Sequence, residues 1–263
     1  MASSTFDIDG TIVGIRTTDR DFASWLDAAL GGYRSVTNAD PTYSVVIGGR
    51  EGTVQGFHIL YHGTARLIRT IDLEAVARAL IDEVASNTLR DRMDAVFVRA
   101  AAVQVNGSVA LVPPAAVTSM EPSVRSLARS GFRLPVSRWV AIGSDGSLVP
   151  RTLLQLPSDI FDSFCDRNDA RDERFIPRDP RPVDTIVTNA PEGGTGVGTS
   201  PRAVALHRLA SATLNLEALG GTALEYLFRA VSGARCIELD RASADAYPTR
   251  LARAILGLEL SAG

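Results

Sequence analysis

The sequence feature that most constrains the fold is an asparagine–glycine pair between two strand-like runs. In the stretch "AVFVRAAAVQVNGSVALVPP", Asn106 and Gly107 separate runs rich in valine and alanine. A two-residue hairpin turn needs positive φ angles at both central residues, and Asn-Gly is a pair that adopts them readily. The sequence therefore predicts a β-hairpin here. Helical patterns elsewhere in the chain make the predicted fold class mixed α/β.

The chain of 263 residues is expected to form two units. Residues 1–90 read as a small α+β unit, and residues 91–263 as a larger domain that contains the hairpin. In the first unit, the patterns predict strands at 5–15, 42–49 and 56–63, and helices at 19–32 and 72–86. In the second, they predict strands at 136–143, 147–156, 184–190 and 236–239, helices at 121–130, 201–217, 222–231 and 246–258, and a charged, exposed loop at 166–182.

Composition excludes several classes of function. The net charge of −3 gives no electrostatic support for binding nucleic acid or an anionic membrane, and no apolar run is long enough to span a bilayer. The N-terminus does not resemble a signal peptide, and Cys165 and Cys236 lack metal-ligand spacing, so we expect a cytoplasmic protein without metal or cofactor. All 27 basic residues are arginine, which excludes a phosphate-binding, Schiff-base or general-base lysine.

A glycine-rich stretch, "GGTGVGTS", resembles a phosphate-binding loop at residues 193–200. Thr199 stands where such a loop needs its lysine. We therefore read a flexible loop and the start of a helix, with Ser200 as the N-cap and Pro201 in the first turn.

A second short motif, "FDIDGTI", matches the start of a haloacid-dehalogenase-type phosphatase site. In that interpretation Asp7 is the nucleophile and Asp9 the general acid. The alternative is a strand that ends in an Asp-Gly turn. A phosphatase stays open as an alternative function.

The three histidines are read as structural residues. His58 and His62 lie four residues apart on one face of a predicted strand, and two residues are too few for a metal site. We expect them at surface or half-buried positions, and His207 within a helix.

The segment from Val98 to Ile142 resembles the HPr kinase/phosphorylase-related family. It reads "VRAAAVQVNGSVALVPPAAVTSMEPSVRSLARSGFRLPVSRWVAI" and keeps the family's order of an "AAAV" strand, a turn, a "VALVP" strand and a helix ending in "GF". The resemblance implies an HPr-kinase-like domain of the P-loop type, preceded by the small N-terminal unit.

The same resemblance implies that the phosphate loop is degenerate. Pro114 and Ser119 stand at its two glycines, Met120 at its lysine and Glu121 at the residue that binds Mg²⁺. Prolines at 114 and 122 each remove a backbone N–H from the region that would cradle phosphate. Glu121 places negative charge where a triphosphate would bind.

The metal and base positions implied by the resemblance are also replaced. The family's paired aspartates fall on Ser137 and Arg138, and a family histidine falls on Arg99. Without the lysine, the metal ligands and the base, phosphoryl transfer loses both positioning and charge compensation. The resemblance therefore implies a pseudokinase.

Kinases of the resembled family act on proteins. A member that has lost its chemistry is therefore implied to bind a peptide or protein partner. The chain is also similar to the precursor-peptide-binding proteins of crocagin-type pathways, which implies a ribosomal precursor peptide held for tailoring enzymes. At least a homodimer is expected. Two binding modes stay open, a groove beside the former ATP site and strand addition at sheet edges around Tyr43, Val45, Phe57 and Ile59. An oligomeric structural subunit is a further alternative.

Overall fold

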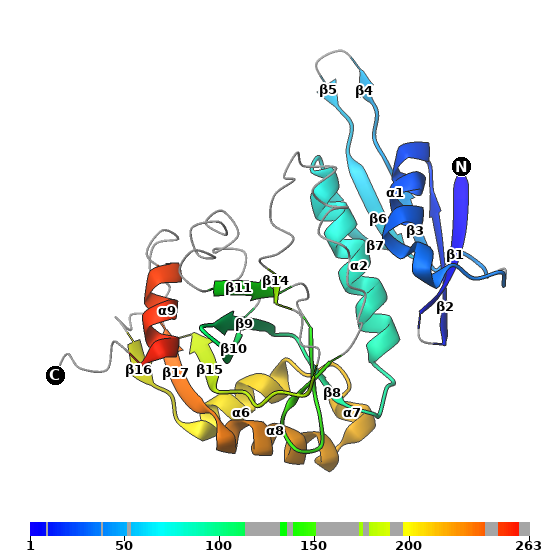
Figure 1. Cartoon of the computed structure of the whole chain (residues 1–263). Coiled ribbons are helices and arrows are strands. Elements are labelled where there is room, and N and C mark those ends of the chain that lie inside the picture. Colours follow the sequence, from blue (N-terminus) through cyan, green and yellow to red (C-terminus); the bar gives the residue numbers. More distant parts are fainter. Residues whose placement is uncertain are drawn as a thin grey trace. The chain divides into compact units, whose positions relative to one another are not determined.

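The computed structural model describes residues 1–8, 10–37, 39–51, 54–113, 132–135, 139–150, 174–175, 179–189, 197–239 and 247–257. Among them, Met1–Thr88 belong to one compact unit, and the residues from Leu89 onward belong to a second. Each unit combines helices with a sheet, so the fold is mixed α/β (Figure 1).

The first unit is built on a five-stranded sheet with the order β1-β2-β3-β6-β7. β2 and β3 run parallel, while the other neighbours are antiparallel. A parallel pair needs a crossover, and helix α1 provides it. The strands are β1 (Ala2–Ile8), β2 (Thr11–Thr17), β3 (Tyr43–Val46), β6 (His58–His62) and β7 (Ala65–Thr70), and the pair β4 (Arg50–Glu51) and β5 (Val54–Gln55) lies between β3 and β6 in the chain.

The two helices of this unit form within or close to the predicted ranges, 19–32 and 72–86. α1 (Arg20–Leu30) begins at Asp19, whose carboxylate accepts the N–H of Phe22 at 2.8 Å, and a 3-10 turn, η1 (Gly31–Tyr33), follows it. α2 (Leu73–Leu89) follows Asp72, whose carboxylate accepts the N–H of Glu74 at 2.9 Å. Apolar side chains three or four positions apart are buried on one side of each helix. They are Phe22, Trp25, Leu26 and Ala29 in α1, and Val76, Leu80 and Val84 in α2.

Both helices contact the same face of the five-stranded sheet. The strand register places Ser4, Ile15 and Tyr43 in one row across β1, β2 and β3, so their side chains share a face. The Ser4 hydroxyl donates to Asp27 of α1 at 3.1 Å, and the Asn87 amide of α2 donates to the Tyr43 hydroxyl. The alternate residues of each strand therefore point to the other face of the sheet.

The second unit contains a seven-stranded sheet, ordered β14-β11-β9-β10-β15-β17-β16, and a three-stranded sheet, ordered β13-β12-β8. The predicted hairpin is confirmed: Asn106 (φ 47°) and Gly107 (φ 92°) form the turn between β9 and β10. The strands are β8 (Val96–Val98), β9 (Ala101–Val105), β10 (Ser108–Val112), β11 (Phe132–Pro135), β12 (Val140–Ile142), β13 (Leu148–Val149), β14 (Arg174–Phe175), β15 (Thr185–Asn189), β16 (Val197–Thr199) and β17 (Arg235–Leu239).

Helices cover both faces of the seven-stranded sheet. Leu111, Ile186 and Cys236 share a core with α6 and α8 on one face. Ala110 and Val187, one residue away along the same strands, share the other core with α9. This alternation is expected for strands that are buried on both faces. The helices are α6 (Arg202–Ser211), α7 (Leu216–Leu219), α8 (Gly221–Gly233) and α9 (Tyr247–Leu256) (Figure 1).

Two local predictions near residue 200 are wrong. Ser200 does not cap a helix: Pro201 occupies the N-cap position, no side chain bonds there, and residues 197–199 pair with β17. The helix predicted at 201–217 ends at Ser211, because Thr213 and Asn215 turn toward β8 and the segment before it. A short second helix, α7, starts after that turn.

Other predicted elements fall partly or wholly outside the residues described. They are the helix at 121–130, most of the strand at 147–156, most of the loop at 166–182 and the first part of the glycine-rich stretch at 193–200. Among the helices that the structure describes, none is both long and apolar enough to cross a bilayer.

Candidate functional site

The candidate site is the edge of the large sheet where three parallel strands end. β10 pairs in parallel with β15, and β15 with β17, so that Val112, Asn189 and Leu239 end at the same edge. In open α/β sheets, ligands bind outside the carboxyl ends of the strands. The half-buried Pro113 follows Val112 directly, so the segment that resembles a degenerate phosphate loop starts at this edge.

Arg99 stands where the resemblance places a family histidine. It comes two residues before a strand that begins at the same edge of the sheet. β9 runs antiparallel to β10, so that Ala101, at the start of β9, is opposite Val112. Arg99 precedes Ala101 by two residues and is exposed, with its guanidinium 5.8 Å from the centroid of the Trp139 ring. The other positions carried over from the resemblance lie outside the described residues: Pro114, Ser119, Met120, Glu121, Ser137 and Arg138.

A polar network that the sequence did not predict lies at the ends of β15 and β17. The hydroxyls of the buried Thr188 and Ser200 are 3.2 Å apart, and the Ser200 hydroxyl donates to Glu238 at 3.2 Å. The Ser200 N–H donates to the backbone carbonyl of Cys236 at 3.0 Å. No sequence signal indicated this network, because β15 already contains three polar residues and Ser200 was interpreted as a helix cap. The network adds one carboxylate to this edge, which opposes phosphate binding there.

Cys236 lies in β17 and faces the core under α6 and α8. Burial raises the pKa of its thiol, against a smaller lowering by Arg202. The thiol is therefore neutral and poorly reactive near pH 7.

This burial gives a test of the packing in the second unit. We expect iodoacetamide at pH 8 to modify Cys236 at least about tenfold more slowly in the folded chain than in urea, measured by peptide mass spectrometry. Equal rates of modification in the folded and the urea-unfolded chain would contradict the buried position.

Burial of Cys236 also predicts a dependence of stability on pH. The folded thiol holds its proton to higher pH than the unfolded thiol does. The free energy of unfolding should therefore fall as pH rises above about 8.5, the ordinary thiol pKa.

The three histidines occupy different environments. His58 is buried, which corrects the expected surface or half-buried position: its Nδ1 accepts the N–H of Gly48 at 3.2 Å. His62 is half-buried, with its ring 5.0 Å from that of Tyr43, and His207 is exposed on α6. Within the described part of the chain, no three His, Cys, Asp or Glu residues cluster as metal ligands would.

Asp7 belongs to the hairpin between β1 and β2. Its carboxylate accepts the N–H of Gly10 at 2.8 Å, and Gly10 has a φ of 88°. Gly10 thus takes the positive φ of a turn between the two strands, and the Asp7 carboxylate bonds to that turn. Asp9 lies outside the described residues.

The expected edge strands are interior strands. β3 lies between β2 and β6, and β6 lies between β3 and β7, so neither offers an unpaired backbone to a peptide. Tyr43 and Val45 are fully buried under the helices and cannot contact a ligand. Phe57 and Ile59 differ: Phe57 is exposed, and Ile59 is half-buried on the opposite face. The sequence showed the strands but not which of them lie at the edge.

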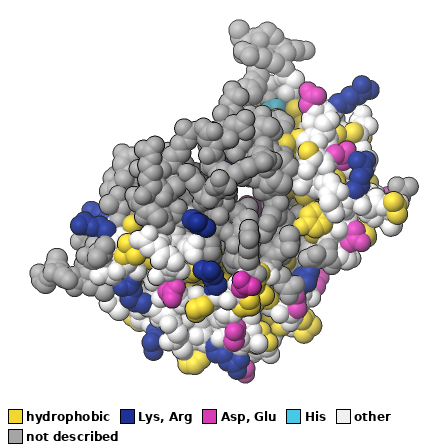
Figure 2. Space-filling model, viewed as in Figure 1, with side chains coloured by type: hydrophobic (Ala, Val, Ile, Leu, Met, Phe, Trp, Pro, Cys, Tyr) yellow, Lys and Arg dark blue, Asp and Glu magenta, His cyan; other side chains and the backbone are white. Residues whose placement is uncertain are grey.

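Surface charge is mixed. Figure 2 shows basic and acidic side chains interspersed over the coloured part of the visible face, consistent with the net charge of −3. No protein-family model, no curated protein and no solved structure matches this chain.

Proposed function

We propose that this chain is a non-catalytic, kinase-derived protein that binds a peptide or protein partner, with a precursor peptide held for tailoring enzymes as the expected ligand. One observation carries the proposal. The segment after β10 starts where α/β proteins bind phosphate, at the carboxyl end of a parallel strand, yet it begins Pro113-Pro114 and continues to Met120-Glu121-Pro122.

The chemistry of that segment opposes nucleotide binding. A phosphate loop works because successive backbone N–H groups and a lysine surround the anion. Prolines lack the N–H, Glu121 carries the wrong charge, and the sequence contains no lysine that could replace the missing one. Glu238 contributes a further carboxylate at the same edge. These changes each oppose the binding of a nucleotide phosphate, and together they support loss of phosphoryl transfer.

The binding role rests on the resemblance to kinases that act on proteins, which is an argument from analogy. The proposal includes at least a dimer, because relatives of the resembled fold assemble. Light scattering tests this part separately.

The test of lost catalysis is calorimetry with Mg-ATP. We expect no saturable heat up to about 1 mM, the weak end of useful affinity, and no release of phosphate above the rate without protein. The phosphatase alternative is tested in the same preparation with a panel of phosphate esters, using Asp7→Asn as the control variant. ATP turnover, or ester hydrolysis abolished by Asp7→Asn, would overturn the proposal.

The test of binding is selection of a random dodecapeptide library on the full chain. We expect enrichment of related sequences whose synthetic copies bind in solution by fluorescence anisotropy. If no sequence binds, the peptide-binding function is wrong, whatever the result with ATP.

A further inference from the structure

The face of the five-stranded sheet opposite α1 and α2 carries apolar side chains on its inner strands. Val46 of β3 is directly opposite Ile59 of β6, and both point away from the helices. Val46 is 36% exposed, and the neighbouring Phe57 is 46% exposed. An antiparallel sheet with one solvated face normally alternates apolar-in with polar-out. The apolar outward residues here depart from that pattern.

Arginines bound this apolar area on both sides. One cross-strand row joins Arg16 of β2, Ser44 of β3, Tyr61 of β6 and Arg66 of β7. The next row joins Val46, Ile59 and Arg69. We call Val46, Phe57, Ile59 and Tyr61, together with Arg16, Arg66 and Arg69, the outer patch.

The outer patch is positively charged. Arg16, Arg66 and Arg69 are all exposed, and the outward positions of β2, β3, β6 and β7 include no Asp or Glu. The acidic residue on this face of the five strands is the exposed Asp7 of β1, which is opposite Ile12 and four positions along β2 from Arg16. The whole run from 54 to 71 also lacks an acidic residue. Arg16 donates through Nε to the Ser44 hydroxyl at 2.7 Å, and the guanidinium of Arg69 lies 3.8 Å from the centroid of the Phe57 ring. An anionic partner would therefore meet two arginines that already have an ordering contact.

We propose that the outer patch docks an extended peptide segment in which an apolar residue is flanked by two carboxylates. Strands are about 4.8 Å apart, so Arg16 and Arg66, three strands apart in one row, are about 14 Å apart. In an extended chain, residues i and i+4 are about 13 Å apart and point to the same side, with i+2 between them. The arrangement Glu-x-Leu-x-Glu thus places its glutamates at Arg16 and Arg66 and its leucine over Ser44 and Tyr61, beside the row of Val46 and Ile59. This inference rests on the proposed peptide-binding function and assigns its site.

A second copy of this chain fits the outer patch less well. In a twofold contact through this face, arginines of one copy would meet arginines of the other, and like charges at an interface cost several kcal/mol. An acidic peptide has the complementary charge.

Single-stranded nucleic acid also fits less well, although arginines and aromatic rings occur together here. Such proteins stack bases on exposed ring faces. The guanidinium of Arg69 lies 3.8 Å from the centroid of the Phe57 ring and covers that face, and Tyr61 is half-buried. The apolar Val46 and Ile59 offer nothing to a phosphate backbone.

The experiment uses the full chain and a fluorescein-labelled probe, Gly-Ser-Glu-Thr-Leu-Thr-Glu-Ser-Gly, in anisotropy titrations at low salt. Control probes replace both glutamates with lysine, or place the glutamates two residues apart. The test variant is Arg16→Glu with Arg66→Glu, and the charge-matched control is Arg202→Glu with Arg208→Glu, two exposed arginines of α6. Circular dichroism confirms that each variant folds.

We expect the test variant to bind the glutamate probe at least about tenfold more weakly, and the control variant with Arg202→Glu and Arg208→Glu to change affinity less than twofold. The lysine probe should fail on the natural chain and regain binding to the test variant, which loss of folding cannot mimic. Binding should weaken as salt rises.

Each of the following results would overturn the inference. One is equal binding of the two glutamate spacings, and another is no effect of the test variant. Tighter binding of a labelled oligo-dT strand than of the probe would do the same. So would a dimer in sedimentation that the test variant dissociates, which would assign the patch to self-association. If selected dodecapeptides bind but ignore Arg16 and Arg66, the proposed function stands and this site is wrong.

Discussion

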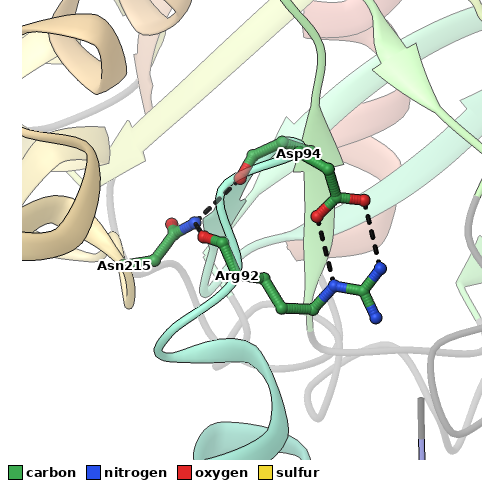
Figure 3. A network of polar contacts seen from close by, with 4 residues as sticks. Arg92, Asp94 and Asn215 are labelled. Atoms are coloured by element: carbon green, nitrogen blue, oxygen red, sulfur yellow. Dashed lines mark hydrogen bonds and ion pairs between the residues drawn. The ribbon is translucent and has the colours of Figure 1, made fainter. Parts of the chain in front are cut away.

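Replacing Asn215 with alanine is expected to lower the free energy of unfolding of the second unit by about 3 kcal/mol. Asn215 is 1% exposed, and its side chain makes three hydrogen bonds to backbone groups. Its carbonyl oxygen accepts the N–H of Phe97 at 3.0 Å, and its amide donates to the carbonyl of Ala95 at 2.8 Å. The amide also donates to the carbonyl of Arg92 at 2.6 Å (Figure 3). Each buried group left without a partner costs about 1–3 kcal/mol, and the Arg92 carbonyl can regain water.

The effect of Asn215→Ala is measured by urea unfolding in a Trp25→Phe background, so that the buried Trp139 reports on the second unit. Glu217→Gln is the control, an exposed change in α7, the short helix that begins directly after Asn215. It should alter the free energy of unfolding by less than about 0.5 kcal/mol. Asn215→Asp keeps the acceptor for Phe97 but loses both donated bonds, so it should also destabilise. A loss below about 1 kcal/mol for Asn215→Ala would show that the three bonds are replaced by water.

Asn215 illustrates what local sequence patterns miss. Residues 201–217 read as one helix because their apolar spacing is helical, but residues 212–215 instead bond to β8 and the turns around it. The Arg99 N–H donates to the Ala212 carbonyl at 2.8 Å, and the Leu214 N–H donates to the Phe97 carbonyl at 2.8 Å. These partners are more than 100 positions apart in the chain, so no sequence window contains both. Tertiary hydrogen bonds override helix propensity here.

The elements predicted well are those whose signal is local. The Asn106-Gly107 turn fixes its own φ angles, and Asp19 caps α1 through an N–H three residues away. Strand order depends on contacts between residues far apart in the chain. In β15, which lies between β10 and β17, Thr185 pairs with Ala110, about 75 residues earlier, and with Arg235, about 50 residues later. The alternation of β6 predicted a strand but could not show which face the helices cover.

The same distinction applies to the candidate sites. The position of Pro113 at the end of β10 follows from the hairpin, which the sequence predicts. The outer patch does not follow, because Arg16, Tyr61 and Arg66 come from three strands whose order the sequence leaves open. Ser200 was misread for a related reason: a local cap rule lost to strand pairing with β17.

Among the glycines of the second unit that the structure describes, Gly146 has the closest backbone neighbour to the place where a side chain would begin. It lies in the turn between β12 and β13, with a φ of 83°. A Cβ atom there would lie 2.5 Å from the backbone nitrogen of Ala230 and 2.7 Å from the backbone carbon of Arg229, both in α8. The turn is otherwise well bonded: Asp145 accepts the hydroxyl and the N–H of Ser147, which lowers the pKa of Asp145. The turn can therefore relieve the clash only by moving away from α8.

Gly146→Ala is expected to lower the free energy of unfolding by about 3 kcal/mol, of which about 1 comes from the positive φ and the rest from the separation of the turn and α8. Gly107→Ala is the matched control, because Gly107 has a φ of 92° but no atom within 4 Å of its would-be Cβ. That variant should lose about 1 kcal/mol. Both are measured by urea unfolding with Trp139 as reporter. The difference isolates the contact between turn and helix from the cost of the backbone angle, and equal losses would mean that the turn does not pack against α8.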